Sequence, residues 1–388
     1  MATIALGSYA VQFPVGGYFS WVLQWLVGLR DLGHEPWFVE RAHYSGSCFD
    51  PSTNTMSDDC SFGTSSLRAL LERFGLGDRW CFVDAQGNYH GRPRSEIEDV
   101  LAGAELFIDM GANGTWDDET RSTQSRVYVD GEPAFTQFKW ALRSSASVEQ
   151  YDAYYTVGQN IGQPWCPAPT SGIQWRPILY PVVTRMFPVV APPADAPFTT
   201  VMSWAAHDRL QFDGVTYGAK DMEFPKFIDL PRRVGVPVEI AVNAPAPRPL
   251  LAEHGWRIRD ALDVSSTFDQ FCDYIRSSRG EFSVCKNGFV ATRSGWVGDR
   301  IGAYLACGRP VVMQDTGFGE RLPCGEGLFA VRDLDEAVDA IGRIEAEPER
   351  HRAAARAIAE THFEAESVLE PMLAELGIRS PGRAATRS

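Results

Sequence analysis

The sequence of 388 residues has no long apolar run, and its first residues are unlike a secretory signal. A helix that crosses a membrane needs about 20 mostly apolar residues, and a signal peptide needs a basic start followed by an apolar stretch. The beginning of this chain, MATIALGSYAVQFP, offers neither. These absences predict a cytoplasmic protein without an integral membrane segment.

Positive charge is also scarce. The chain carries 36 Lys and Arg residues against 50 Asp and Glu residues, which gives a formal net charge of -14. Proteins that bind nucleic acids or anionic lipids usually present a basic face. The charge balance therefore argues against a nucleic-acid partner, although a local basic pocket can still bind one small phosphate ligand.

The cysteines form no C-x-x-C pair and have no histidine partner close by in the sequence. In a reducing compartment, such isolated cysteines are expected to be buried thiols and not disulfide partners or zinc ligands. No metal site is therefore predicted. The eight residues are Cys48, Cys60, Cys81, Cys166, Cys272, Cys285, Cys307 and Cys324.

The length and the composition, which is 44% hydrophobic and 22% charged, indicate two folded domains. The chain opens with a predicted strand at residues 3–8, a glycine-containing loop at 12–17, a helix at 19–32 and a strand at 37–40. This succession is typical of a doubly wound α/β domain. Further segments continue the pattern: helices at 65–74 and 95–101, and strands at 105–109, 126–129 and 153–157.

Residues 162–197 are rich in proline, which enters neither a helix interior nor a central strand, so the connection between the domains is expected there. A second α/β unit then follows. Its predicted strands are 198–203, 237–241, 281–285 and 310–314, and its predicted helices are 223–229, 297–307, 334–345 and 351–362. The predicted division is residues 1–190, residues 191–350, and C-terminal helices at 351–388 that cross back to the first domain and end in a frayed tail.

Ligands of open α/β sheets bind beyond the carboxyl ends of the strands, where glycine loops and helix N-termini offer N–H groups to anions. The second half has three such loops, at residues 204–220, 287–298 and 315–327. We expect a diphosphate to bind among them. The candidate residues there are His207, Lys220, Lys286, Arg293, Gly295, Trp296, Asp299, Arg300, Asp315, Thr316, Gly317, Phe318 and Gly319.

The cations of this set could stabilise the negative charge that develops as a nucleoside diphosphate departs. Taken singly, each could instead be a solvated surface residue. The glycines could equally be turn formers that need positive φ, and Trp296 could be a packing residue.

Two stretches carry a resemblance to a known family. The opening GGYFSWVLQWLVGLRDLGHEPWFVE is similar to the start of the acceptor domains of GT-B glycosyltransferases, in which a helix ending in L-x-x-x-G-H-E leads into the second strand. The later GEFSVCKNGFVATRSGWVGDRIGAYLACGRPVVMQDTGFGERLP resembles the donor half of the spore-protein (CgeB-like) glycosyltransferases, above all in SGW-x-x-DR and YLACGRPVV.

The resemblance implies the GT-B fold, with two Rossmann-like doubly wound domains that face each other across a cleft. It implies a nucleotide sugar, such as a UDP-sugar, bound mainly by the C-terminal domain, and a small-molecule or glycan acceptor bound by the N-terminal domain. Transfer would need neither a metal nor a further cofactor. Lys220 and Arg300 match positions at which the family binds diphosphate or opens its donor helix.

One departure concerns two glutamates, with seven residues between them, that related retaining families often carry near this helix. Gly295 and Ala303 stand at the corresponding positions. Asp299, Asp315, Glu320 or Glu326 are the candidates to replace those carboxylates. The stereochemistry of transfer is therefore left open.

An inverting reaction needs a general base in the N-terminal domain. Asp109 beside GANG and Asp130 in YVDGEPAF each end a predicted strand, and they are the candidates; the alternative is a turn or capping role. A nucleotide-sugar epimerase or hydrolase, or a non-catalytic ligand-binding or spore-assembly protein, are the other functions that the sequence leaves open. A monomer or homodimer is expected.

Overall fold

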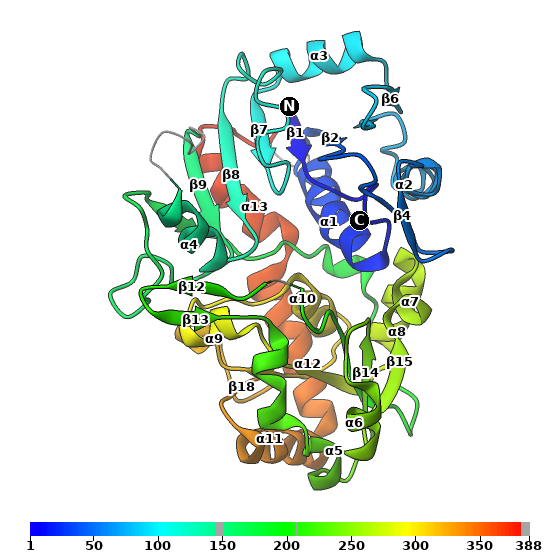
Figure 1. Ribbon diagram of the computed structural model, residues 1–388, viewed down its shortest axis with the longest axis vertical. Coiled ribbons are helices and arrows are strands. Elements are labelled where there is room, and N and C mark those ends of the chain that lie inside the picture. The colour runs from blue at the N-terminus through cyan, green and yellow to red at the C-terminus, as the bar shows by residue number, and fades with distance from the viewer. Residues whose placement is uncertain (144–150, 207, 382–388) are drawn as a thin grey trace.

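The computed structural model describes residues 1–143, 151–206 and 208–381, which fold into two α/β domains stacked along the long axis of the molecule (Figure 1). This architecture of parallel sheets confirms the predicted pair of doubly wound domains. None of the described helices combines the length and the apolarity that crossing a bilayer requires.

The N-terminal domain is built on an eight-stranded sheet of order β10-β9-β8-β7-β1-β2-β5-β6. Its central strands are buried on both faces and therefore read as short apolar runs, as in the TIALG segment of β1. All described pairings are parallel except that of β5 with β6. The strands are β1 (Thr3–Gly7), β2 (Glu35–Arg41), β5 (Trp80–Val83), β6 (Tyr89–His90), β7 (Leu106–Asp109), β8 (Arg126–Asp130), β9 (Ala153–Thr156) and β10 (Trp175–Pro177).

Helices cover both faces of this sheet, and α1 is the most buried of them. It ends where Gly33 adopts a φ of +85°, a left-handed conformation that stops a helix at little cost for glycine. The helices are α1 (Gly16–Asp31), α2 (Ser61–Arg73), α3 (Arg94–Gly103) and α4 (Phe135–Leu142), and a hairpin of β3 (Cys48–Asp50) and β4 (Thr55–Ser57) lies beside α2.

The C-terminal domain has a six-stranded parallel sheet of order β15-β14-β11-β16-β17-β18. Its strands are β11 (Phe198–Met202), β14 (Val238–Val242), β15 (Arg257–Asp260), β16 (Gly280–Ser283), β17 (Val311–Gln314) and β18 (Leu328–Val331). A hairpin of β12 (Leu210–Phe212) and β13 (Val215–Tyr217) is inserted after β11. The longer helices are α6 (Arg248–Glu253), α7 (Ala261–Ser265), α8 (Phe268–Ser277), α9 (Asn287–Ala291), α10 (Asp299–Ala306) and α11 (Leu334–Ala346).

The single helix that we predicted at residues 223–229 is wrong. The segment forms short turns instead: η3 (Lys220–Met222), η4 (Phe224–Phe227) and α5 (Leu230–Arg233). Pro225 and Pro231 stand in the first turns of η4 and α5, and neither can donate the backbone hydrogen bond that a continuous helix needs.

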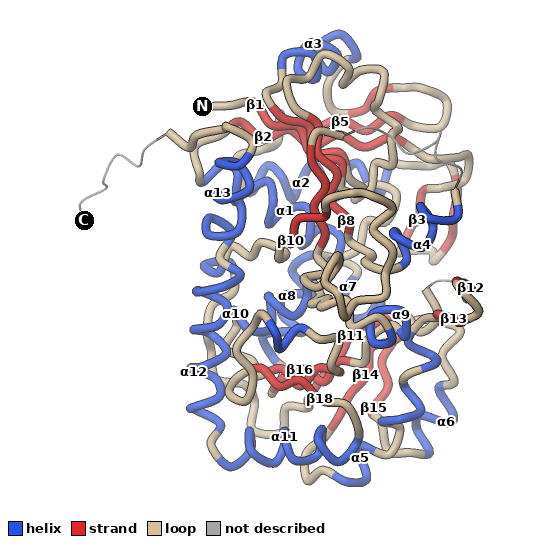
Figure 2. The backbone as a smooth tube through the Cα atoms, turned by 90° about the vertical axis from the view of Figure 1, so that its left-hand side faces the viewer, coloured by secondary structure: helices blue, strands red, loops and turns tan. Residues whose placement is uncertain are grey.

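The end of the chain runs back along one side of both domains (Figure 2). α12 (Pro348–Ile358) packs on the C-terminal domain, η6 (Ala359–Phe363) is a π-helical turn, and α13 (Ala365–Glu375) packs on α1 of the N-terminal domain. Gly28 allows this approach, because a Cβ added there would lie 2.9 Å from Cβ of Ala365.

The order of the strands fixes where each sheet can bind a ligand. In the C-terminal domain the chain leaves β11 toward β14 on one side and later returns to β16 on the other, so the connections diverge between β11 and β16. In the N-terminal domain the corresponding point lies between β1 and β7. A crevice at the carboxyl ends of such strands is the usual ligand site of doubly wound sheets.

Candidate functional site

Lys220 lies near the point where the connections of the C-terminal sheet diverge. The chain leaves β11, forms the β12–β13 hairpin and then docks against α9, where the N–H of Gly218 donates to Oδ1 of Asn287 at 3.2 Å and the N–H of Asn287 donates to the carbonyl of Ala219 at 3.2 Å. This joins the segment after β11 to the segment after β16. Lys220 therefore stands where the two connections diverge.

The Lys220 ammonium group is buried, with 7% of the residue exposed. Burial, with the positive charge of Arg300 as the next cause, lowers its pKa to about 7. Among the described residues, no carboxylate forms an ion pair with it. A cation that is buried without a partner is costly, and an anionic ligand would remove this cost.

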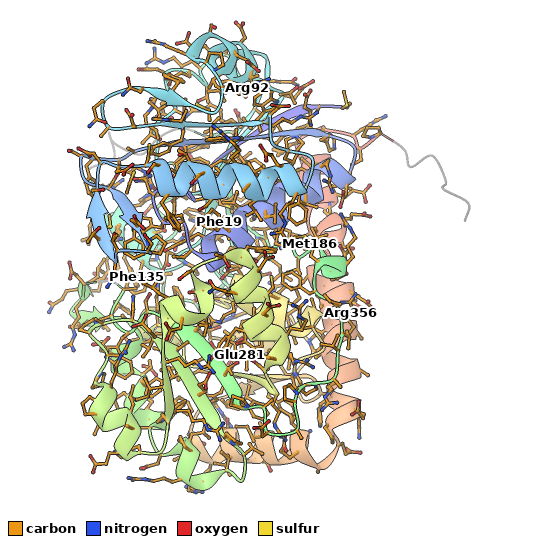
Figure 3. All side chains as sticks on the ribbon, turned by 90° about the vertical axis from the view of Figure 1, so that its right-hand side faces the viewer. Phe19, Arg92, Phe135, Met186, Glu281 and Arg356 are labelled. Atoms are coloured by element: carbon orange, nitrogen blue, oxygen red, sulfur yellow. The ribbon has the colours of Figure 1, made fainter. Side chains whose placement is uncertain are left out.

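Arg300, at the start of α10, is held by acceptors within its own domain. Its Nε donates to Oε1 of the fully buried Glu281 at 2.8 Å, and its Nη2 donates to Oγ of Ser283 at 3.2 Å. Figure 3 places Glu281 within the C-terminal domain. Burial raises the pKa of Asp299, the first residue of the helix. Arg300 thus adds positive potential beside Lys220 while remaining paired.

Lys286 reaches across the boundary between the domains. Its Nζ lies 2.6 Å from both carboxylate oxygens of Glu132, in the loop between β8 and α4. It also lies 5.4 Å from the centre of the Phe289 ring and 6.0 Å from that of Phe135. Figure 3 shows Phe135 at the level where the two domains meet. Lys220 and Lys286 of the C-terminal domain and Glu132 of the N-terminal domain therefore form one group of charges, the polar centre.

A cavity of about 410 Å³ opens at the same boundary. It lies at the carboxyl end of β11, against α4. The residues that line it are Phe135, Lys139, Ala205, Ala206, Asp208, Arg209 and Leu210. His207, another predicted site residue, lies outside the residues that the structure describes.

Lysine is rare in this chain, and its distribution follows the site. The sequence has four lysines. Lys220 and Lys286 form the polar centre, Lys139 lines the cavity, and Lys226 is exposed and pairs with Glu223 at 2.6 Å. Lysine, unlike arginine, can change its protonation state when it is buried. The sequence shows that lysines are few, but only the fold shows that three of the four lie at the polar centre or at the cavity.

The glycine-rich loops contact the N-terminal domain through Asn160. Asn160, fully buried in the loop after β9, donates from Nδ2 to the carbonyls of Arg293 and Gly317, both at 3.0 Å. A Cβ on Gly295 would lie 2.9 Å from the Asn160 backbone, and one on Gly317 would lie 2.7 Å from Nδ2. The positive φ angles of these glycines thus accompany a close contact with Asn160 of the other domain.

The neighbouring candidates support this contact. The Thr316 hydroxyl donates to the carbonyl of Trp296 at 2.7 Å, and Trp296 forms a backbone bridge with Gly158 of the N-terminal domain. The Trp296 ring lies 4.7 Å from that of Phe289, which favours the packing role. Phe318 is fully buried in the core.

Three further candidates lie at the edge of this contact. Arg293 is exposed, and its Nη1 lies 3.4 Å from Oδ2 of Asp315. Oδ1 of Asp315 accepts a hydrogen bond of 2.7 Å from the N–H of Gly317 and so shapes the turn. Gly319 is exposed. These residues are not brought together with Lys220 by any described contact.

The two candidate bases are fully buried and occupied. The Asp109 carboxylate accepts hydrogen bonds from the N–H groups of Gly111, Asn113 and Gly114 and from the Tyr151 hydroxyl. That of Asp130 accepts from the Glu132 N–H and from side chains of Thr136, Gln137 and Thr156. Burial raises the pKa of both aspartates. The geometry favours the alternative role, in which each holds a loop.

The loop after β1, the equivalent anion site of the N-terminal domain, is filled by the protein itself. The Glu40 carboxylate, buried at the end of β2, accepts hydrogen bonds of 2.6 to 2.9 Å from the N–H groups of Ala10, Val11 and Gln12. These are the donors that a phosphate would use. The cationic crevice of the C-terminal domain is therefore the better site for an anion.

An aromatic cluster of the N-terminal domain lies within electrostatic range of Glu132 and Asp299, and the sequence had not singled it out. Tyr9 lies 5.0 Å from Tyr18 and 5.3 Å from Trp21, and Trp21 lies 6.5 Å from Tyr180, between ring centres. Burial, followed by the negative charges of Glu132 and Asp299, raises the pKa of Tyr18 to about 12. The cluster thus provides flat apolar faces beside the carboxylates.

Comparison with known proteins finds relatives in structure only. No protein-family model matches the chain, and no curated protein matches it in sequence. Solved structures do match. One is Anabaena Alr3699/HepE in complex with UDP and glucose, with a TM-score of 0.58 and 11% identity over 97% of this chain and 100% of that one.

Two other enzymes match over similar lengths. An alpha-glucosyltransferase in complex with UDP and a 13-mer DNA gives a TM-score of 0.57 and 10% identity, over 96% of this chain and 98% of that chain. AviGT4, a glycosyltransferase involved in avilamycin A biosynthesis, gives 0.52 and 13%, over 97% of both chains. At such identities the similarity shows the fold, and this chain has the two-domain GT-B fold that we expected.

Proposed function

We propose that this protein is a glycosyltransferase that moves a sugar from a UDP-sugar to an acceptor held by the N-terminal domain. The observation that carries the proposal is Lys220, a buried, unpaired lysine at the divergence point of the C-terminal sheet. The structural neighbours add support, since HepE and the alpha-glucosyltransferase are described in complex with UDP. The finer resemblance to CgeB-like enzymes stays a prediction from the sequence.

Lys220 and Lys286 would bind the diphosphate in this mechanism. Both lie at the carboxyl ends of the strands that flank the crevice, and Arg300 strengthens the positive potential around them. As the bond between the sugar and the diphosphate breaks, negative charge grows on the departing oxygen, and fixed ammonium groups stabilise it. The ammonium groups supply this charge, so the proposal includes no metal and no cofactor beyond the donor.

Glu132 is the better candidate for a carboxylate that acts on the acceptor. It lies in the N-terminal domain at the polar centre, and 41% of its side chain is exposed, whereas Asp109 and Asp130 are inaccessible. In an inverting transfer, its carboxylate would take the proton of the acceptor hydroxyl. Whether the configuration at the anomeric carbon of the sugar is inverted depends on whether Glu132 acts as this base.

The acceptor side favours a ligand with a flat face. Tyr9 and Tyr18 are partly exposed and lie within electrostatic range of Glu132, and such aromatic rings stack on sugar rings or other planar groups. A small molecule or a glycan fits this description. A DNA acceptor, as in the alpha-glucosyltransferase complex, fits a net charge of -14 less well.

Calorimetric titration with UDP, GDP and dTDP tests the donor site. We expect UDP to bind, and we expect Lys220→Met to weaken binding at least about tenfold, as the loss of a charge-assisted contact does. The matched control is Lys226→Met, which removes an exposed lysine six positions away and should bind as the natural chain does. If none of the three nucleotides binds at millimolar concentration, the proposal fails.

Product analysis separates transfer from the alternative reactions. Incubation with UDP-sugar alone should leave the donor largely unchanged, because transfer needs an acceptor. Rapid conversion of the donor without acceptor would instead identify an epimerase or a hydrolase on the same fold.

A further inference from the structure

A thiol, an imidazole and a carboxylate meet at the outer edge of the N-terminal sheet. Cys60 precedes α2, Asp84 follows β5, and His90 ends the edge strand β6. One potential ligand atom from each lies within 4.8 Å of the other two, and no other described group of three such residues is this close. Figure 1 shows α2, β4 and β6 together along one margin of the upper domain.

One ring nitrogen of His90 contacts both partners. Its Nε2 lies 2.9 Å from Oδ2 of Asp84 and 3.6 Å from Sγ of Cys60. A ring nitrogen carries either one proton or one lone pair. A proton directed at the carboxylate leaves the sulfur without a good partner, and a lone pair directed at the thiol faces the carboxylate lone pairs. A cation among the three atoms would satisfy all of them.

The same geometry excludes a nucleophilic triad. In that arrangement the carboxylate binds one ring nitrogen and the nucleophile binds the other, so that the imidazole lies between them. Here Nε2 of His90 contacts both the carboxylate of Asp84 and the sulfur of Cys60.

We propose that Cys60, Asp84 and His90 form a structural zinc site, with water as the fourth ligand. Zinc–sulfur and zinc–nitrogen bonds of about 2.3 and 2.0 Å at a tetrahedral angle place S and N about 3.5 Å apart, close to the 3.6 Å observed. The same angle places N and O about 3.3 Å apart, so the contact of 2.9 Å between His90 and Asp84 would lengthen by about 0.4 Å when zinc binds. A set of S, N and O ligands suits zinc, whereas magnesium and calcium prefer oxygen alone.

The surroundings already orient the carboxylate for this role. Oδ1 of Asp84 accepts hydrogen bonds from the backbone N–H groups of Gln86 at 3.0 Å and Asn88 at 2.8 Å, which turns Oδ2 toward His90. Such outer contacts fix the ligands of metal sites. When zinc binds, the Cys60 thiol releases its proton to solvent, and His90 carries its remaining proton on Nδ1.

The bound ion would link the start of α2 to the β5–β6 hairpin. α2 also contacts the loop after β1, since a Cβ on Gly63 would lie 2.2 Å from the carbonyl of Val11, and it ends at Arg73, whose Nη1 lies 2.8 Å from Oδ2 of Asp269 in the other domain. The site therefore supports an element that borders the domain junction. It does not depend on the proposed sugar transfer.

Titration of the full chain with Co²⁺ tests the proposal, after treatment with a chelator. Tetrahedral cobalt bound by a thiolate absorbs in the near ultraviolet and in the visible. We expect one Co²⁺ per chain with both absorptions, displacement by one equivalent of Zn²⁺, and a rise in melting temperature with Zn²⁺. The absence of a thiolate band at millimolar Co²⁺ would overturn the site.

Variants assign the ligands. Cys60→Ser should abolish the thiolate band, and His90→Gln and Asp84→Asn should each weaken Zn²⁺ binding at least about tenfold. The matched control is Cys324→Ser, which removes the exposed cysteine of the C-terminal domain and should leave the band unchanged. A band that survives in Cys60→Ser, or disappears in Cys324→Ser, would contradict the assignment. Asp84→Asn retains the shape of the side chain and keeps the test valid if Cys60→Ser does not fold.

Discussion

A buried lysine surrounded by further cations is the residue on which ligand binding should depend most. The folded protein lowers the pKa of Lys220 to about 7, whereas a lysine in an unfolded chain titrates near 10.4. Below pH 7 the amine is charged in both states. Between about pH 7 and pH 10 the folded chain binds fewer protons than the unfolded chain, so this residue makes stability rise with pH.

Two opposite effects of Lys220→Met follow from this titration. The ligand-free variant should melt at a higher temperature than the natural chain at pH 6 to 7, because a buried charge is removed, and the difference should shrink toward pH 10. UDP affinity should fall in the same variant. Melting curves at several pH values, with and without UDP, check both effects. A loss of stability together with a loss of binding would identify Lys220 as a structural residue.

Binding should also take up a proton above pH 7. A diphosphate beside Lys220 favours the charged amine, so the affinity of the natural chain for UDP should decrease as pH rises above about 7, by at most about tenfold per pH unit. Calorimetry at pH 8 in two buffers of different ionisation enthalpy measures the uptake. Lys220→Met should show less uptake than Lys226→Met.

At the scale of elements, the crossing of α1 and α13 depends on the lack of a side chain at Gly28. Gly28→Ala would place a methyl group 2.9 Å from Cβ of Ala365 and 2.8 Å from Cδ1 of Leu369, so we expect a loss of about 1 to 3 kcal/mol in the free energy of unfolding. The matched change is Gly342→Ala in α11, which meets nothing within 4 Å and should gain about 0.5 to 1 kcal/mol. Urea unfolding of both variants checks the difference.

The contact of Asn160 with the glycine loops can be tested by a double-mutant cycle. Gly317→Ala should lower the free energy of unfolding more than Gly172→Ala does. Both glycines have positive φ, of 87° and 76°, but only the first faces a side chain at 2.7 Å. In the Asn160→Ala background the excess cost of Gly317→Ala should decrease by about 1 kcal/mol or more. Equal costs in both backgrounds would show that Asn160 does not limit Gly317.

Some of these elements could be predicted from the sequence, and others could not. The alternation of strands and helices was legible for β1, α1, β11 and α10, because buried strands and amphipathic helices have different periods of apolar residues. The crossing of α13 over Gly28 could not be predicted, because a glycine within a helix does not identify the distant helix that packs against it. The fate of the loops at Gly295 and Gly317 was likewise undecided, since a positive φ suits both a phosphate and a neighbouring asparagine.

At the scale of the whole molecule, one hydrophobic cluster joins the domains. It includes Leu23 of α1, Phe271 of α8, Ile301 of α10, Phe363 of η6 and Leu369 of α13. Residues that share one core lose their packing together. The two domains should therefore unfold as a single cooperative unit.

Calorimetric melting checks this prediction. We expect one transition for the natural chain, whose calorimetric and van't Hoff enthalpies agree, and we expect UDP to shift the entire transition to a higher temperature. Two resolved transitions, of which only one responds to UDP, would show that the domains are energetically independent.

The sequence by itself determined the two doubly wound domains, because strand and helix periodicity is a local property. It also predicted a diphosphate site in the second half of the chain, from the glycine loops and the placement of cations. Only the tertiary structure decided which of those residues meet. It buried Asp109 and Asp130 behind saturated hydrogen bonds, and it brought Glu132 to Lys286 and Cys60 to His90. Such pairs depend on how sheets and helices pack over long sequence separations, and the free energy of that packing is shared among many side chains and is not encoded in any single motif.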